Sequence, residues 1–148
     1  MESMKPLLYS RASEYAVAAL VHLAKSPRGE YVHVKDIARE ENLPAGFLSG
    51  LLQRLSKDGI VSSRKGLNGG FALSVDPDAV SLFEVVCAVD GMPCCDRCAM
   101  GYPACSAENP CEMHNSWTEV REQVREFLRL TTIGELANAR LVCDATRR

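Results

Sequence analysis

The sequence predicts a mainly α-helical protein with one small β-hairpin, arranged as a winged helix-turn-helix with a long helix after it. Three features predict this fold. Two helical patterns flank a turn that contains Pro44, two short apolar runs flank a glycine-rich basic loop, and another helical pattern follows an aperiodic loop. The expected parts are a winged domain at 1–80, a linking helix and cysteine-rich loop at 81–115, a long helix at 116–140 that packs back on the first domain, and a tail at 141–148.

The composition is that of a globular protein without membrane-spanning segments. Of the 148 residues, 47% are hydrophobic and 24% are charged, which excludes disordered and collagen-like chains. The longest apolar stretch, Tyr15 to Ala24, is interrupted by His22 and is far shorter than the roughly 20 residues of a membrane span. The N-terminus lacks the pattern of a secretory signal. We therefore expect a cytoplasmic protein with no membrane partner.

Charge is distributed unevenly along the chain. The net charge is −2, yet residues 1–75 carry ten basic and seven acidic residues, whereas residues 76–148 carry seven basic and twelve acidic residues. The first half therefore suits a polyanionic partner, and the second half suits another task.

The first 41 residues predict two helices and a short strand. Ser10 is a suitable N-cap for a helix at 11–24, and the proline and glycine of residues 26–29 end that helix. Residues 31–34 predict a short edge strand, and residues 35–41 predict a short helix.

A further helix and a hairpin complete the winged domain. The helix is expected at 45–58, where Gly59 stops it. Its expected apolar face consists of Phe47, Leu48, Leu51, Leu52 and Leu55. Two short strands, at 60–64 and 71–74, then form a hairpin around the loop at 65–70.

Capping boxes predict the helix starts in the second half. Ser81, Ser116 and Thr132 are each followed three residues later by a glutamate, so each is expected to open a helix. The first of these helices ends near Gly91, and the last is short. Residues 91–115 have no periodic pattern, and a loop of that length in a small domain is usually functional. The helix after Ser116 has an apolar stripe that suits either a core face or a dimer seam: Trp117, Val120, Val124, Phe127 and Leu128.

The helix-turn-helix and the basic hairpin predict DNA binding. A helix can fill the major groove, and a flexible wing brings cations to the phosphates or to the minor groove. The second helix of the helix-turn-helix is the one at 45–58. Its face opposite the apolar stripe carries Ala45, Gly46, Ser49, Gly50, Gln53, Arg54 and Lys57. Arg64 and Lys65 add positive charge on the wing. The alternative is an exposed charged face that serves contact with another protein.

Five of the seven cysteines fall between positions 94 and 111, and two ligand sets compete for them. Cys95-x2-Cys98 together with Cys111-x2-His114 has the spacing of a structural zinc site. Cys98-x6-Cys105-x5-Cys111 followed by His114 is spaced more widely and can wrap an iron–sulfur cluster. The spacing does not choose between these sets.

Several short motifs in order along the chain resemble one family. They are Ser13-Glu14-Tyr15-Ala16, Asp36-Ile37-Ala38, Phe47-Leu48 with Leu51, residues 59–63, Gly69-Gly70-Phe71 and the Cys/His loop. From about Leu8 to Ala139 the chain resembles the Rrf-type (IscR/NsrR-like) bacterial winged-helix transcription factors. The resemblance implies a homodimer formed through the 116–130 helix, which binds a double-stranded DNA operator of two-fold character.

The resemblance also implies roles for individual residues. The positions that would face the major groove are Gly46, Phe47, Ser49, Gly50 and Gln53. Arg64, Lys65 and Asn68 would belong to the wing. Two departures bear on operator preference: Ala18 stands where arginine is frequent, and Ser49-Gly50 replaces bulkier polar base-readers.

For the cysteine loop, the resemblance favours an iron–sulfur cluster with two or four irons over zinc. Cys98, Cys105 and Cys111 align with the cluster cysteines of the family. His114 is the first candidate for a fourth ligand, and Glu14 of the partner subunit is the second.

Cys94 and Cys95 have no counterpart in the family pattern, and Cys87 and Cys143 lie outside the cysteine cluster. Cys94 and Cys95 either take no part in cofactor binding or act as extra ligands. Cys87 and Cys143 are expected to be small buried hydrophobic residues.

Three classes of function follow from these observations. The leading one is a transcription factor that responds to cluster status, redox change or nitric oxide. The second is a winged-helix regulator whose cysteines bind zinc or form a thiol/disulfide switch. The third, a small redox or metal-carrier enzyme, is the weakest because the sequence has no Ser/His/Asp set and no phosphate-binding loop. We therefore expect a regulator that is not an enzyme.

Overall fold

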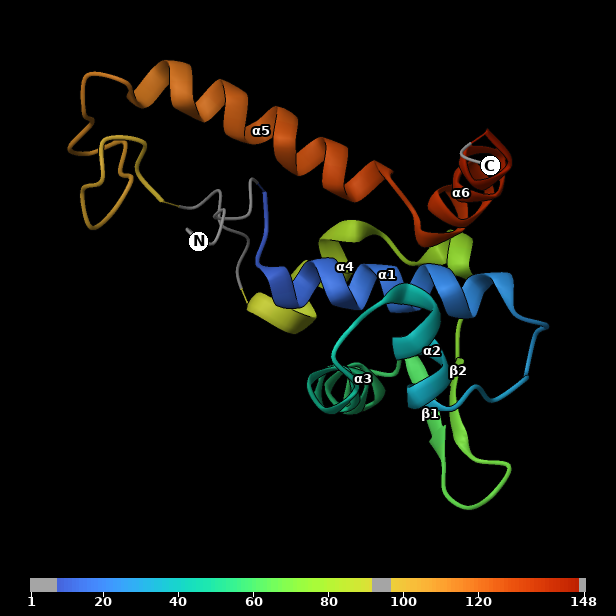
Figure 1. The fold of residues 1–148 in the computed structure, drawn as a ribbon. Helices are drawn as coiled ribbons and strands as arrows, with labels where there is room; N and C mark the ends of the chain where they lie inside the picture. The colour runs from blue at the N-terminus through green and yellow to red at the C-terminus, as the bar shows by residue number, and fades with distance from the viewer. Residues whose placement is uncertain (1–7, 92–96, 147–148) are drawn as a thin grey trace.

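The computed structural model describes residues 8–91 and 97–146, with side chains as far as residue 139. The first part of the fold consists of α1 (Arg11–Lys25), α2 (Val34–Glu41), α3 (Ala45–Lys57), β1 (Val61–Arg64) and β2 (Gly70–Leu73). The second part consists of a 3-10 turn η1 (Pro77–Ala79), α4 (Leu82–Asp90), α5 (His114–Leu130) and α6 (Ile133–Thr146). Figure 1 shows α1 running through the centre, with α2, α3 and the hairpin on one side of it and α5 and α6 on the other.

The helix boundaries of the winged domain follow the sequence signals. The side chain of Ser10 accepts a hydrogen bond from the backbone N–H of Ser13 and so caps α1, and Ser26 ends that helix. Between α2 and α3, Asn42 has φ +56° in the left-handed region, which asparagine tolerates better than most residues. Pro44 then precedes the first turn of α3. The tight turn between the two helices is therefore confirmed.

The hairpin has the predicted antiparallel pairing, with Val61 opposite Leu73 and Arg64 opposite Gly70. The predicted edge strand at 31–34 was wrong in its extent. Val32 alone pairs with Phe71 through an isolated bridge, because the chain enters α2 at Val34.

The core lies between α1 and the elements on both sides of it. Leu20, Ile37, Leu52, Leu128 and Ile133 have no exposed surface. They come from five different helices, so burial of their side chains holds the helix-turn-helix and the C-terminal helices in one core.

Two capping boxes meet where the winged domain joins the C-terminal helices. Ser81 and Glu84 form the predicted box at the start of α4, with the Ser81 N–H donating to the Glu84 carboxylate over 2.8 Å. Thr132 and Glu135 form the second box at the start of α6. Ser81 pairs with Thr132 through a bridge, so the base of α5 is fixed to α4. The residues 141–146, expected as part of a tail, continue α6.

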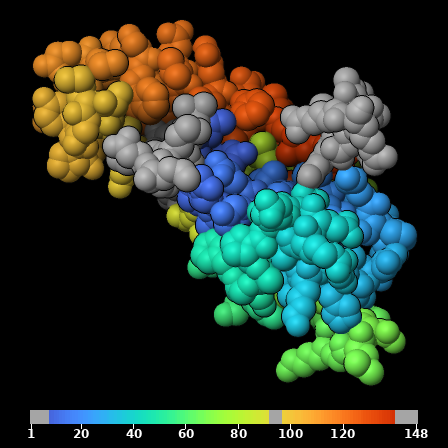
Figure 2. All heavy atoms as spheres, in the orientation of Figure 1, coloured from blue at the N-terminus to red at the C-terminus, as the bar shows by residue number. Residues whose placement is uncertain are grey.

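The predicted start of α5 at Ser116 was wrong. The helix begins at His114, after Met113, whose side chain makes no capping hydrogen bond. The turn at 111–114, closed by a hydrogen bond from the N–H of His114 to the carbonyl of Cys111, leads directly into the helix and places Ser116 inside its first turn. The N-terminal end of α5 and the cysteine loop project beyond the body of the molecule (Figure 2). Among the described residues, no helix is long and apolar enough to cross a membrane.

We expect Gly70→Ala to lower the free energy of unfolding by about 2 kcal/mol or more. Gly70 has φ +135°, and a Cβ there would lie 2.2 Å from the carbonyl oxygen of Val32, which is backbone and cannot move aside alone. Denaturant-induced unfolding measures the change. Gly50→Ala is the matched control, because a Cβ on that α3 residue meets nothing within 4 Å, and we expect it to stabilise the helix by about 0.5–1 kcal/mol. Equal stability of the two variants would contradict the prediction.

Candidate functional site

The outer face of α3 presents small and polar residues to solvent. Gly46, Gly50 and Gln53 are exposed, and Ser49 is half-buried. A Cβ added to either glycine would meet no atom within 4 Å, so a large partner can approach this face closely. The residues predicted to face a groove therefore share one open surface.

Phe47 lies at the edge of that surface rather than on the buried face. Its side chain is 52% exposed, and its ring meets the ring of Tyr15 edge-on with centroids 5.9 Å apart. The apolar stripe of α3 is therefore narrower than predicted and consists of the four buried leucines, Leu48, Leu51, Leu52 and Leu55.

The wing projects from the same side of the molecule and is held by two contacts. The guanidinium of Arg64 lies over the ring of Tyr31, 4.1 Å from its centroid. Nε2 of His33 lies 2.8 Å from the backbone carbonyl oxygen of Leu67, so the ring donates to the wing tip from the N-terminus of α2. Lys65 and Asn68 are exposed beside them. The wing is thus braced against the helix-turn-helix before any partner binds.

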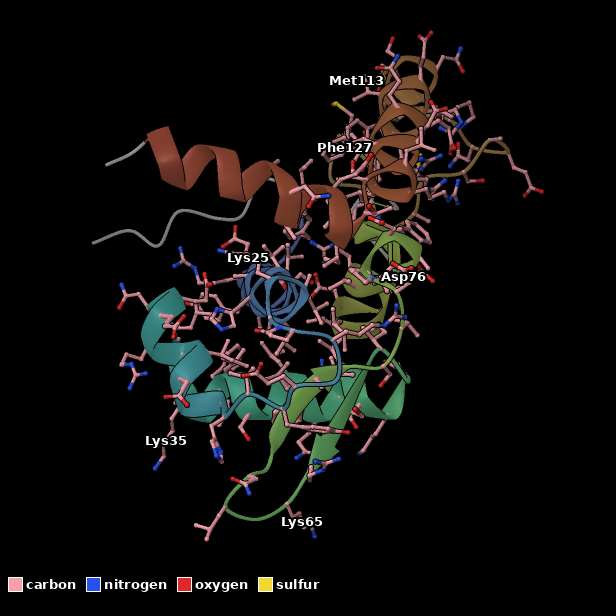
Figure 3. All side chains as sticks on the ribbon, turned by 90° about the vertical axis from the view of Figure 1, so that its right-hand side faces the viewer. Lys25, Lys35, Lys65, Asp76, Met113 and Phe127 are labelled. Carbon is pink, nitrogen blue, oxygen red and sulfur yellow. The ribbon has the colours of Figure 1, made fainter. Side chains whose placement is uncertain are left out.

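Figure 3 shows Lys65 near the tip of the wing and Lys35 at the same end of the molecule. Sequence reasoning missed Tyr31 and His33 as supports of the wing, because each acts across more than 30 residues of sequence. The sequence did offer one signal for these supports, an aromatic residue and a histidine that precede a basic hairpin.

Arg54 stands apart from the other predicted DNA contacts. Its Nη1 donates a hydrogen bond to the backbone carbonyl of Val89, near the end of α4, over 2.6 Å. The side chain is exposed overall, but this guanidinium nitrogen is engaged within the protein.

The described part of the cysteine loop brings four predicted ligands to one cavity. The cavity has a volume of about 540 Å³, and its lining includes Cys98, Cys105, Cys111 and His114. Glu14 is exposed on α1 and does not line it.

Within the cavity the four groups form two pairs. The sulfurs of Cys98 and Cys111 lie 3.6 Å apart, and the sulfur of Cys105 lies 3.4 Å from Nδ1 of His114. In the described ranges, no three side chains of Cys, His, Asp or Glu converge as ligands of a single ion. Of the predicted zinc set, His114 pairs with Cys105 instead of joining Cys98 and Cys111, and Cys95, like Cys94, lies outside the described residues.

The two members of the first pair differ in acidity. Burial raises the pKa of Cys98, but hydrogen bonds from the backbone N–H groups at 100–102 and from the Cys111 thiol outweigh it, so the pKa lies below its ordinary value. Burial raises the pKa of Cys111, and the adjacent Cys98 sulfur raises it further, against a hydrogen bond from the N–H of Met113. Cys98 is therefore the member that more readily adopts the thiolate form, which binds metal.

The cysteine loop is tied to the start of α5. Nε1 of Trp117 donates a hydrogen bond to the carbonyl of Arg97 over 2.8 Å. This contact accounts for the half-buried position of Trp117, which the apolar stripe had assigned to a core face or a dimer seam. Cys87, outside the loop, lies half-buried on α4.

The stripe on α5 divides between two faces. Leu128 is fully buried and Val124 half-buried against the core. Met113, Val120, Phe127 and Leu130 are between 46% and 68% exposed. Met113, Val120 and Phe127 follow one another at intervals of seven residues, the repeat of helices that pack side by side. Figure 3 shows Met113 and Phe127 along α5, on the part of the molecule opposite the wing.

Known proteins share this sequence pattern and this architecture. The sequence pattern of the Rrf2 family, described as "Iron-dependent Transcriptional regulator", matches residues 9–139. The HTH-type transcriptional regulator IscR of Escherichia coli is 33% identical over 134 residues, which cover 90% of this chain and 82% of IscR. An Aquifex aeolicus protein named as an HTH-type transcriptional regulator is 34% identical over 134 residues, 89% of this chain and 92% of that protein. The structure of CymR, the global cysteine regulator of B. subtilis, is similar with a TM-score of 0.76, 27% identity, and coverage of 90% of this chain and 98% of CymR.

Proposed function

Because the chain belongs to the Rrf2 family of transcriptional regulators, we propose that it is a DNA-binding homodimer whose operator affinity depends on an iron–sulfur cluster. Cys98, Cys105 and Cys111 would hold the cluster, with His114 as the fourth ligand. Glu14 of the partner subunit is the alternative fourth ligand. When bound, the cluster supplies a redox-active centre that oxidants, nitric oxide and iron shortage can remove.

The cavity of about 540 Å³ is the observation that carries this proposal. A zinc ion needs four ligands around one point, whereas no three Cys, His, Asp or Glu side chains of the described residues converge on one point, and the four candidate ligands line one large cavity. Backbone N–H groups at 100–102 already donate toward the sulfur of Cys98, and such hydrogen bonds are typical around cluster sulfurs. The donor set therefore fits an iron–sulfur cluster better than a single ion.

The exposed face of α5 supports the dimer. Met113, Val120, Phe127 and Leu130 form an apolar stripe along one side of the helix that the described residues leave exposed. A second copy of α5 covers such a stripe symmetrically, and a symmetric dimer is the commonest closed oligomer. Two copies of α3 then face two half-sites of an operator, with Gln53 as the main candidate for base contacts and Lys65 and Asn68 at the wing.

Purification without oxygen tests the cofactor. We expect a brown protein that contains iron and acid-labile sulfide and that selects a palindromic duplex from a random-sequence DNA pool. A colourless protein that contains zinc, or no retained duplex, would contradict the proposal.

A thiol switch without a cluster is the second candidate. The 3.6 Å separation of the Cys98 and Cys111 sulfurs favours it, because a short movement brings them to disulfide distance. A colourless protein whose operator affinity changes reversibly with a thiol reductant would support this candidate.

We expect Lys65→Gln to reduce the salt dependence of DNA binding. If the Lys65 ammonium neutralises a phosphate, the slope of log affinity against log salt falls by about 0.9 for each phosphate that is no longer neutralised, one in each subunit. Titration of the selected duplex at several salt concentrations measures the slope. Gln53→Ala is the control, and it should keep the slope and relax the preference among duplex sequences. Contacts to bases determine sequence preference, whereas contacts to phosphates fix the position of the protein on the duplex. An unchanged slope in Lys65→Gln would remove this residue from the interface.

A further inference from the structure

The end of α4 holds two helices of the winged domain. From α3, Nη1 of Arg54 donates to the carbonyl oxygen of Val89 over 2.6 Å. From α1, the backbone N–H and the hydroxyl of Ser10 and the hydroxyl of Ser13 all donate to the carboxylate of Asp90. Two consecutive residues of α4 therefore connect the helix that faces the DNA with the N-terminus of α1.

The charges of these contacts match the helix ends at which they lie. The carboxylate of Asp90 lies at the N-terminus of α1, and the guanidinium of Arg54 lies at the C-terminus of α4. Each position is electrostatically favourable, because a helix carries partial positive charge at its N-terminus and partial negative charge at its C-terminus. Ser13 has no exposed surface, so its hydroxyl would lose its acceptor if Asp90 moved away. The junction that Val89 and Asp90 form with α3 and α1 therefore has one strongly preferred arrangement.

The cysteine-rich loop at 91–115, here called the cysteine segment, follows directly after this end of α4. Gly91 caps α4 with φ +81°, a backbone conformation that favours glycine and turns the chain out of the helix. Farther along, the carbonyl of Arg97 is bound by Trp117 of α5. Cys98, Cys105 and Cys111 therefore lie in a loop that is tied to the start of α5, and α5 packs against α4, so a rearrangement among the three cysteines reaches α4 through α5.

We propose that Arg54 is a positioning residue that transmits the state of the cysteine segment to α3, and that it is not a contact to the DNA backbone. The inference rests on the proposed function and deepens it. A displacement of the Val89 carbonyl moves the guanidinium and with it the C-terminal half of α3. Because two copies of α3 must meet half-sites at a set spacing, a small rotation changes operator affinity.

The test compares Arg54→Gln with Lys57→Gln, which removes the same charge from the same helix one turn later. Both variants and the wild type are prepared with and without cluster, and their affinities for the selected duplex are measured over a range of salt. We expect Arg54→Gln to reduce the affinity ratio between the two forms by about 5-fold or more. Its salt slope and its cluster absorption spectrum should equal those of the wild type. Lys57→Gln should keep the affinity ratio.

Asp90→Asn probes the same junction from the side of α1 and keeps the shape of the side chain, so the test does not depend on one variant. We expect it to reduce the ratio as well, and we expect the double variant with Arg54→Gln to reduce it no further, because both act through one element. An unchanged ratio in Asp90→Asn would overturn the inference.

Two other results are distinguishable. A salt slope reduced by about 0.9 per subunit in Arg54→Gln, with the affinity ratio retained, makes Arg54 a phosphate contact and overturns the inference alone. A wild-type protein that binds the duplex equally with and without cluster, or that takes up no cluster, overturns both the inference and the proposed function.

Discussion

Cys105→Ser is expected to abolish the cluster while the fold and the dimer remain. Cys105 lies in a loop, pairs with His114 and is not among the residues of the hydrophobic core, so the core should not depend on its sulfur. With one ligand removed, residues 98–114 are no longer held in one conformation, and operator affinity should shift by about 5–150-fold, the range of a typical allosteric coupling. Iron and sulfide content, circular dichroism and titration of the selected duplex measure the three effects.

Cys87→Ser is the matched control for this prediction. Cys87 lies half-buried on α4 and does not line the cavity, so its variant should keep both the colour and the affinity. A full cluster in Cys105→Ser would show that the ligand assignment is wrong. Loss of the cluster with wild-type affinity would show that the loop is not the switch.

Phe127→Lys is expected to convert the dimer into a monomer and to reduce operator affinity at least about 100-fold. The ring is 50% exposed on the apolar stripe of α5, and a lysine from each subunit would place two like charges in the interface. The loss is large because binding of the second half-site is then no longer intramolecular. Sedimentation at micromolar concentration measures the mass, and titration of the selected duplex measures the affinity.

Val120→Lys repeats the test at a position one heptad earlier, where the side chain is 48% exposed and the core is not disturbed. Glu126→Lys is the control, because it introduces the same side chain at an exposed position of α5 that is not one of the apolar residues of the stripe. A dimeric Val120→Lys variant that binds the duplex with wild-type affinity would place the dimer interface elsewhere.

The helices of the winged domain and α4 were predictable because their signals are local. Ser10, Asn42 and Ser81 each act on backbone groups within four residues, so the free energy of each helix end depends on neighbours that the sequence shows directly. The hairpin was predictable for the same reason, since its loop and its two apolar runs are adjacent. The start of α5 was not, because the turn before His114 continues into the helix and overrides the capping signal of Ser116.

The cysteine loop shows where sequence spacing stops being informative. Two ligand sets were equally compatible with the positions of the cysteines, because a loop without periodic structure can close in many ways. The pairing of Cys98 with Cys111 and of Cys105 with His114 arises only when the loop is folded against the start of α5.

The amino-acid sequence alone thus sufficed for the family, for the winged domain and for the set of candidate ligands, all of which depend on residue types and short spacings. The tertiary structure decided which of those residues act together. Arg54 reaches Val89 across 35 residues, and Asp90 reaches Ser10 across 80. No local pattern encodes such contacts, because they form only after burial of the common core has brought α1, α3 and α4 together.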